Sequence, residues 1–299
     1  MAVAVHGGER SRSVSTPRRL RRRVRPGLVL KYGFIAIAVA FTLFPIYWIA
    51  VMSIKPATDY IASPPVWFPS DPTTAHWSIL GQLRGWQGLK NSIIVAVATT
   101  AVSVAIGTMA AYSIARFRTG GKHLAFWILS QRIMPPIAVI IPVFLLYTQL
   151  RDNTSVNLLD THVGLVILYT VFTLPFTVWM MYTYFRQLPV EMEEASLVDG
   201  CTRWQSLWKV AFPLAAPGLV SAAVFAFIFS WTEFLFAVVL TSSKAVTLPV
   251  VISGFLGVQA SLLGELGALV VLSMIPAFTL GLLVQRHLVR GLTFGAVQG

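Results

Sequence analysis

Residues 91–115 read NSIIVAVATTAVSVAIGTMAAYSIA, a stretch without a single charged side chain. A helix needs about 20 mostly apolar residues to cross the hydrocarbon core of a bilayer. Five other segments are also long and apolar enough, so six transmembrane helices are predicted, at residues 31–53, 91–115, 124–150, 161–185, 215–241 and 266–285. A seventh apolar run, residues 245–258, is shorter and is interrupted by proline and glycine, which favours a re-entrant or interfacial segment. We therefore expect an all-α integral membrane protein.

The composition supports this class. The chain has 299 residues, of which 56% are hydrophobic and 11% are charged, whereas an ordinary soluble domain has about 25% charged residues. Such a sequence has too few charged residues to surround its apolar residues with a water-soluble surface. This excludes most classes of soluble enzyme. The single cysteine, Cys201, excludes an internal disulfide and a multi-cysteine metal centre.

The net charge of +12 raises the alternative of nucleic-acid binding. The basic residues, however, flank the apolar segments and are not interleaved with aromatic residues as in a nucleic-acid groove. Nucleic acid is therefore not an expected partner, whereas membrane lipid is.

The basic residues also predict the topology. With the amino terminus inside the cell, seventeen Lys and Arg residues face the cytoplasm, five face outward (Lys55, Arg84, Lys90, Arg151 and Lys244), and Arg132 lies within the third segment. The positive-inside rule then predicts that both termini are cytoplasmic. Residues 1–30, with eight arginines between Arg10 and Arg25, are expected to form a basic cytoplasmic arm, and residues 31–299 a transmembrane domain.

The longest internal loop, residues 186–214, has an unusual pattern. Three glutamates, Glu191, Glu193 and Glu194, would occupy the opening turns of a short helix, where the helix dipole favours negative charge. Leu188, Met192, Ala195 and Val198 would form an apolar stripe on it, and Gly200 would end it in a left-handed conformation.

The pattern continues with a second short helix. Thr202 and Gln205 have the spacing of a capping box, and Pro213 is expected to end that helix. Interfacial membrane helices are usually basic on their polar face, so an acidic helix–turn–helix indicates a protein partner.

This loop closely resembles the "EAA" loop of binding-protein-dependent ABC importer permeases. That signature is Glu-Ala-Ala, three residues, Gly, nine residues and Ile-x-Leu-Pro. Here it reads Glu194-Ala195-Ser196, three residues ending at Asp199, Gly200, nine residues, and Val210-Ala211-Phe212-Pro213. Further stretches resemble the MalG-type sugar permeases (residues 110–117, 134–136, 229–236 and 291–299), although that family usually has Asn where Thr232 stands.

The resemblance implies a type I ABC importer permease fold in a bacterial cytoplasmic membrane. It also implies partners: a second, non-identical permease subunit, a dimer of ATPase subunits that bind ATP and Mg²⁺, and an external solute-binding protein. The cargo would be an oligosaccharide, a disaccharide or a polyol. The residues that couple the chain to the ATPase would be Glu194, Ala195, Ser196, Asp199, Gly200, Val210, Phe212 and Pro213.

Two ionisable residues lie within apolar segments, where charges are costly and indicate function. Arg132 either lines the translocation pathway or forms a structural ion pair, and Glu233 is a candidate for facing the pathway together with its neighbours Trp231 and Thr232. The aromatic residues Trp179, Tyr182 and Tyr184 either stack on sugar rings or serve as packing and interface anchors.

The sequence has no site for chemistry of its own. Around Gly121-Lys122, Arg116 stands where a Walker A motif needs its first glycine, and no catalytic or metal-binding pattern is present, so no cofactor is expected in this chain. A secondary transporter or channel without an ATPase is the alternative, but it should show internal repeats or a relay of buried acids. An intramembrane enzyme is a further rival. Neither rival accounts for the acidic loop.

Overall fold

The computed structural model describes residues 26–255 and 262–293, and all regular elements within these ranges are helices. The chain divides into two units, residues 1–47 and residues 48–299. Most of the predicted basic arm, and residues 294–299 of the tail, lie outside the described residues. Helix α1 (Pro26–Met52) begins inside the predicted arm, and most apolar residues of its first two thirds, among them Phe34, Ile37 and Phe41, are exposed. A helix that is apolar all round suits a lipid or protein environment.

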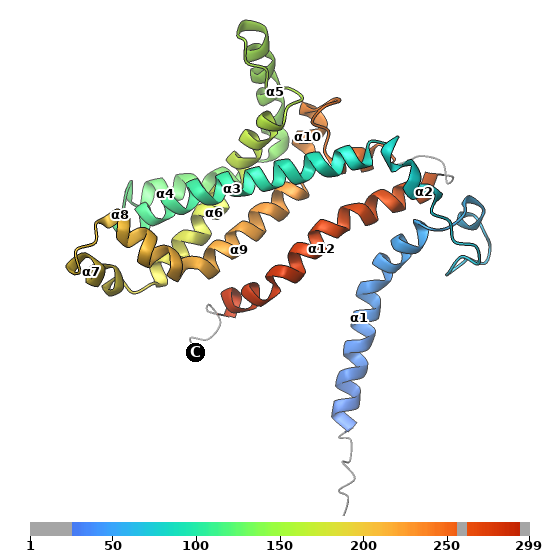
Figure 1. Cartoon of the computed structure of the whole chain (residues 1–299), viewed down its shortest axis with the longest axis horizontal. Coiled ribbons are helices and arrows are strands. Elements are labelled where there is room, and N and C mark those ends of the chain that lie inside the picture. The colour runs from blue at the N-terminus through green and yellow to red at the C-terminus, as the bar shows by residue number, and fades with distance from the viewer. Residues whose placement is uncertain (1–25, 256–261, 294–299) are drawn as a thin grey trace, which may run out of the picture. The chain divides into compact units, whose positions relative to one another are not determined.

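The second unit is built on four long helices, α3 (Gly85–Phe117), α6 (His162–Gln187), α9 (Phe212–Trp231) and α12 (Leu263–Thr293). Helix α3 packs against α6 and α9, and α9 packs against α12 (Figure 1). Small residues bring α3 and α6 close together: a Cβ atom on Gly107 would lie 2.8 Å from Thr177 Cγ2, and the hydroxyls of Ser103 and Thr173 are 2.6 Å apart. Close packing of small residues and hydrogen bonds between helices are the usual basis of association in a bilayer.

Five helices of the described residues are long and apolar enough to cross a membrane, and a bent pair of helices is a sixth candidate. The predicted third span, residues 124–150, is not one continuous helix. Helix α4 (Gly121–Ser130) and a short 3₁₀ turn, η3 (Gln131–Ile133), are followed by α5 (Pro136–Asn153) after a bend of 93°. The cause is the Pro135-Pro136 pair, because a residue that precedes proline avoids the helical region, and both Met134 and Pro135 are extended.

The prediction of a fifth span at residues 215–241 is also wrong in its limits. One helical stretch runs from Arg203 to Trp231, through α8 (Arg203–Ser206), a π-helical segment η4 (Leu207–Ala211) and α9. Pro213 does not end the second loop helix as expected. The wider π turn that precedes it makes room for the proline ring, which would collide with a carbonyl in a regular α-helix.

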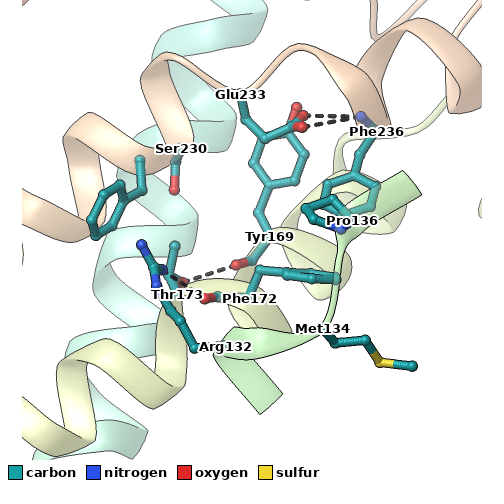
Figure 2. A pocket seen from close by; sticks show the side chains of 10 residues that line it. Arg132, Met134, Pro136, Tyr169, Phe172, Thr173, Ser230, Glu233 and Phe236 are labelled. Atoms are coloured by element: carbon teal, nitrogen blue, oxygen red, sulfur yellow. Dashed lines mark hydrogen bonds between the residues drawn. The ribbon is translucent and has the colours of Figure 1, made fainter. Parts of the chain in front are cut away.

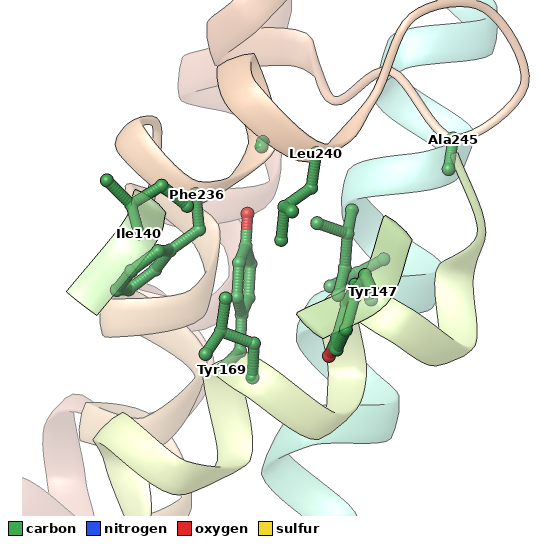
Figure 3. Packing of buried hydrophobic residues seen from close by; sticks show 10 residues of the cluster. Ile140, Tyr147, Tyr169, Phe236, Leu240 and Ala245 are labelled. Atoms are coloured by element: carbon green, nitrogen blue, oxygen red, sulfur yellow. The ribbon is translucent and has the colours of Figure 1, made fainter. Parts of the chain in front are cut away.

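Beyond Trp231 the chain leaves the helix for three residues and then forms two short helices, α10 (Leu235–Leu240) and α11 (Leu248–Ser253). Helix α11 is too short to span a bilayer, in agreement with a non-spanning seventh run; residues 256–258 of that run lie outside the described residues. Around α10, Tyr169, Phe236 and Leu240 form a buried core with Ile140 and Tyr147 of α5 (Figure 3).

The segment between residues 54 and 84 is ordered by polar contacts. It contains a 3₁₀ turn η1 (Ala57–Tyr60), helix α2 (Ala75–Ser78) and a second turn η2 (Ile79–Gly81). The His76 ring lies 2.9 Å from the Lys55 carbonyl oxygen on one side and 3.3 Å from the Glu265 carboxylate on the other. These contacts tie the segment to the first turn of α12.

The connection between α10 and α11 is fixed by Asp160. Its carboxylate accepts hydrogen bonds from the backbone N–H groups of residues 242–245 at 2.9–3.2 Å. Partial burial acts to raise the pKa of Asp160, but the N–H groups of Lys244 and Ala245 and the Ser243 hydroxyl outweigh it and hold the pKa below its ordinary range. Asn91 supports the same connection by donating to the Lys244 and Val246 carbonyls at 2.9 Å.

We predict that Asp160→Asn destabilises the protein at neutral pH by about 1–2 kcal/mol, because it removes the charge that the N–H groups stabilise. A carboxylate with a lowered folded-state pKa contributes its stability above the unfolded-state pKa of about 3.9 and loses it as pH falls through the folded-state pKa. The difference in melting temperature between wild type and variant should be constant above about pH 5 and shrink below about pH 4. Thermal unfolding in detergent across this range measures it.

The control is Asp152→Asn, since that side chain is 55% exposed and pairs with Arg151 on the surface. It should change the melting temperature little. A difference for Asp160→Asn that does not vary with pH would contradict the proposed role of the charge.

Candidate functional site

The acidic loop forms the predicted helix–turn–helix. Helix α7 (Glu191–Val198) carries its three glutamates in the first turn. It ends at Gly200, whose φ is +88°, with the N–H of Cys201 donating to the Ser196 carbonyl and the N–H of Gly200 to the Leu197 carbonyl, a pair of bonds that defines a Schellman motif. Thr202 and Gln205 form the predicted capping box.

Glu193 attaches α7 to the membrane helices. Its carboxylate lies 2.7 Å from the Arg116 guanidinium and accepts a 2.7 Å hydrogen bond from the Tyr112 hydroxyl. The side chains of Arg116 and Glu193 are only 8% and 10% exposed. Ser196 on the same face is 2.7 Å from the Ser206 hydroxyl. Helix α7 is thus joined to the end of α3 by a buried ion pair and to α8 by a hydrogen bond.

The opposite face of α7 is open. Of the predicted coupling residues, Glu194, Ala195, Asp199, Gly200 and Pro213 are exposed, Val210 and Phe212 are half-buried, and Ser196 is buried. The predicted apolar stripe lies largely on the exposed surface, with Met192 47% and Val198 88% exposed. This apolar face of α7 is therefore not part of the core and is open to contact with another molecule.

Sequence reasoning missed Glu193 as a structural residue. Its spacing from Ser196 by three residues puts both side chains on one helix face, while Glu194 is on another. The pattern alone could not show that the buried face of α7 is the polar one, because its partner, Arg116, comes from a helix about 80 residues earlier.

A second candidate site is a cavity of about 320 Å³ where α6, α9, α10 and the bend between α4 and α5 meet (Figure 2). Both intramembrane charges line it. Glu233 accepts hydrogen bonds from the Phe236 N–H at 3.1 and 3.2 Å, at the first turn of α10. Tyr169 is buried, and its ring points toward Glu233.

Arg132 enters the same cavity from the bend. It donates to the Phe172 carbonyl at 3.3 Å, and its guanidinium carbon lies 4.3 Å from the centre of the Phe229 ring. Within the described ranges no carboxylate lies at ion-pair distance from Arg132. The described residues therefore contain no structural ion pair at Arg132.

Trp231 and Thr232 do not join that cavity. They line a separate hollow of about 410 Å³ beside α11 and α12, and Trp231 is buried with its ring stacked on Phe227. The break after Trp231 sends Glu233 to one side and Thr232 to the other. The ring of Tyr184 packs against Gly218, whose missing Cβ would lie 2.5 Å away.

No group of three or more metal-ligating side chains occurs in the described part of the chain. The cavity around Glu233 combines one negative charge, one positive charge and several aromatic faces. Such a set can donate to and accept from hydroxyl groups and pack against flat apolar rings.

We predict that Glu193→Ala destabilises the protein by about 3–5 kcal/mol, since it leaves the Arg116 guanidinium buried without its partner. Glu194→Ala is the matched control, one residue away and exposed, and should change stability by less than about 0.5 kcal/mol. Thermal unfolding of the purified variants measures both. Equal effects of the two substitutions would contradict the structural role assigned to the ion pair of Glu193 and Arg116.

Comparison with known proteins places these features in context. The model of a family described as binding-protein-dependent transport system inner membrane component matches residues 103–294. The trehalose transport system permease protein SugB of Mycobacterium tuberculosis is 36% identical over 88% of this chain and 95% of that protein. The trehalose/maltose transport system permease protein MalG of Thermococcus litoralis is 33% identical over 94% of this chain and 100% of that protein.

Solved structures agree. A chain of a bacterial ABC transporter involved in the import of the acidic polysaccharide alginate superimposes with a TM-score of 0.72, at 25% identity, over 86% of this chain and 95% of that chain.

Proposed function

The chain belongs to the family of binding-protein-dependent transport system inner membrane components, and we propose that it is the translocating subunit of an ATP-driven importer for a sugar. The observation that carries the proposal is α7, a short acidic helix joined rigidly to α3 and open on its other face. A secondary transporter would have no use for such a docking helix. The chain is a transport subunit and not an enzyme.

The ATPase partner would bind the exposed face of α7. Met192, Ala195 and Val198 offer apolar contact, Glu194 and Asp199 offer negative charge, and Gly200 gives the tight bend that follows. ATP and Mg²⁺ would be bound by two such ATPase subunits. When these close on ATP, each pulls its coupling helix, and the ion pair of Glu193 and Arg116 passes that movement to α3.

The remaining parts follow from this arrangement. A second, non-identical permease subunit would complete the pathway, and an external binding protein would deliver the cargo on the opposite side. The excess of Lys and Arg on the α7 side supports a cytoplasmic location for α7 and both termini in a bacterial inner membrane.

The cargo we propose is an oligosaccharide, a disaccharide or a polyol, as the names of the relatives suggest. Arg132 and Glu233 are the residues proposed to meet it, because they bring hydrogen-bonding groups into one membrane-embedded cavity with aromatic walls. Trp231 and Thr232, in the neighbouring hollow, are proposed to face another part of the pathway.

The direct test is co-purification of the tagged chain from its native membrane, followed by ATP-driven uptake in liposomes. An ATPase and a second permease should co-purify, and uptake should require ATP. Purification of the chain alone, with transport in the absence of ATP, would favour a secondary transporter.

We predict that Gly200→Val abolishes ATP-driven uptake while membrane insertion persists. The backbone φ of +88° disfavours any β-branched residue, whereas a Cβ at this position would meet nothing within 4 Å, so the constraint is on the backbone and not on space. Gly200→Asn is the matched control, since Asn tolerates the left-handed region, and should retain most of the uptake. Normal uptake by Gly200→Val would refute the role of the bend.

We also predict that Glu233→Gln changes the uptake of one sugar relative to another by about 10-fold while basal ATPase activity stays within about 2-fold, since a lost charge–hydroxyl bond is worth about 1.5–3 kcal/mol. Gln can still accept the hydrogen bond from the Phe236 N–H. Competition between labelled sugars in liposomes measures the ratio. Parallel loss of uptake and ATPase activity would instead mark Glu233 as structural.

A further inference from the structure

A third cavity, of about 600 Å³, lies where the end of α3, the start of α4 and the end of α6 meet. It is separate from the cavity around Glu233 and from the ion pair of Glu193 and Arg116. Two arginines, Arg118 and Arg186, stand among its lining residues, which are Ile114, Ala115, Arg118, Gly121, Ala125, Tyr182 and Arg186.

The charges of these two arginines are not neutralised by a carboxylate in the part of the chain that the structure describes. The contact made by Arg186 is with the ring of Tyr182, at 5.8 Å. Arg116, only two residues before Arg118, has Glu193 as a close partner. The cavity therefore concentrates uncompensated positive charge beside a helix end where another arginine is fully paired.

The backbone at Arg118 supports a role for its side chain. Arg118 follows the last turn of α3 with φ of +51°, a conformation that costs an L-residue about 1–2 kcal/mol and that Gly or Asn usually adopts. An arginine kept at such a position is a candidate for a binding role.

The cavity also has an apolar side. Ile114 and Ala115 of α3 and Ala125 of α4 supply aliphatic surface. Next to Ala125, Phe126 and Trp127 are 72% and 61% exposed, as expected of aromatic side chains at the boundary between hydrocarbon and headgroups. A ligand that fits must carry negative charge at one end and apolar groups at the other.

We propose that this cavity binds an anionic glycerophospholipid of the cytoplasmic leaflet, with Arg118 and Arg186 contacting its phosphate and the aliphatic wall contacting its acyl chains. Basic pockets between transmembrane helices on the cytoplasmic side are suited to such headgroups, and arginine matches phosphate geometry. A free phosphate ion would use the arginines but not the apolar wall. The inference rests on the proposed orientation of the importer.

The test uses the intact transporter complex in mild detergent, without ATP or sugar, so its outcome is independent of transport. Native mass spectrometry follows binding of phosphatidylglycerol, phosphatidylcholine and inorganic phosphate. Wild type should bind phosphatidylglycerol in preference to phosphatidylcholine. The double variant R118Q/R186Q should bind phosphatidylglycerol about 30-fold more weakly, from the contribution of two arginines near a membrane surface.

Two controls keep the test sharp. R118K/R186K retains both charges and should retain most of the binding, which excludes a mere folding defect. R151Q removes an arginine that already pairs with Asp152 elsewhere and should bind like wild type. Unchanged phosphatidylglycerol binding in R118Q/R186Q would overturn the proposal, and so would phosphate competing as well as the lipid. If the wild-type complex prefers phosphatidylglycerol but shows no ATP-driven uptake in liposomes, that result counts against the proposed function and not against the lipid site.

Discussion

The close contact of α3 with α6 is the constraint on which the rest of the structure depends. Gly107 lets the helices approach until there is no room for a methyl group against Thr177, and the Ser103–Thr173 hydrogen bond holds them in one register. In a bilayer, apolar side chains gain little by leaving lipid for protein, so packing and hydrogen bonds of this kind set the arrangement. The cavity around Glu233, which α6 lines, and the ion pair of Glu193 with Arg116 of α3 both depend on helices held in this way.

Irregular backbone occurs where the two residues proposed to line the pathway lie. The Pro135-Pro136 bend carries Arg132 to the cavity, and the break after Trp231 turns Glu233 toward it. Non-helical backbone within a membrane is tolerated only where protein or water covers its polar groups. Glu233 meets this requirement for α10 by accepting from the Phe236 N–H. Each of the two charged residues thus lies beside a break in a helix, where backbone groups are free of regular helical hydrogen bonds.

Much of this could be predicted from the sequence, because hydropathy depends on local composition. The six apolar segments, though not the bend in the third or the limits of the fifth, are set by residues close together in the chain. The same holds for the acidic helix, the Gly200 bend and the Thr202 capping box. The misses have a different origin. The π turn that accommodates Pro213, and the pairing of Glu193 with Arg116, depend on partners or backbone geometry that periodicity does not encode. The split of Trp231 and Thr232 from Glu233 arose from a break that hydropathy averages away.

Helix α3 has one more consequence. Near its beginning, Asn91 and Ser92 hold the connection between α10 and α11 through the Lys244 and Val246 carbonyls and the Leu248 N–H, and at its other end Arg116 holds α7. A helix of 33 residues is about 50 Å long at 1.5 Å per residue. A tilt of about 5° at one end of such a rod displaces the other end by about 4 Å. Through α3 alone, a small rotation at one end can therefore displace the groups bound at the other end by several ångströms.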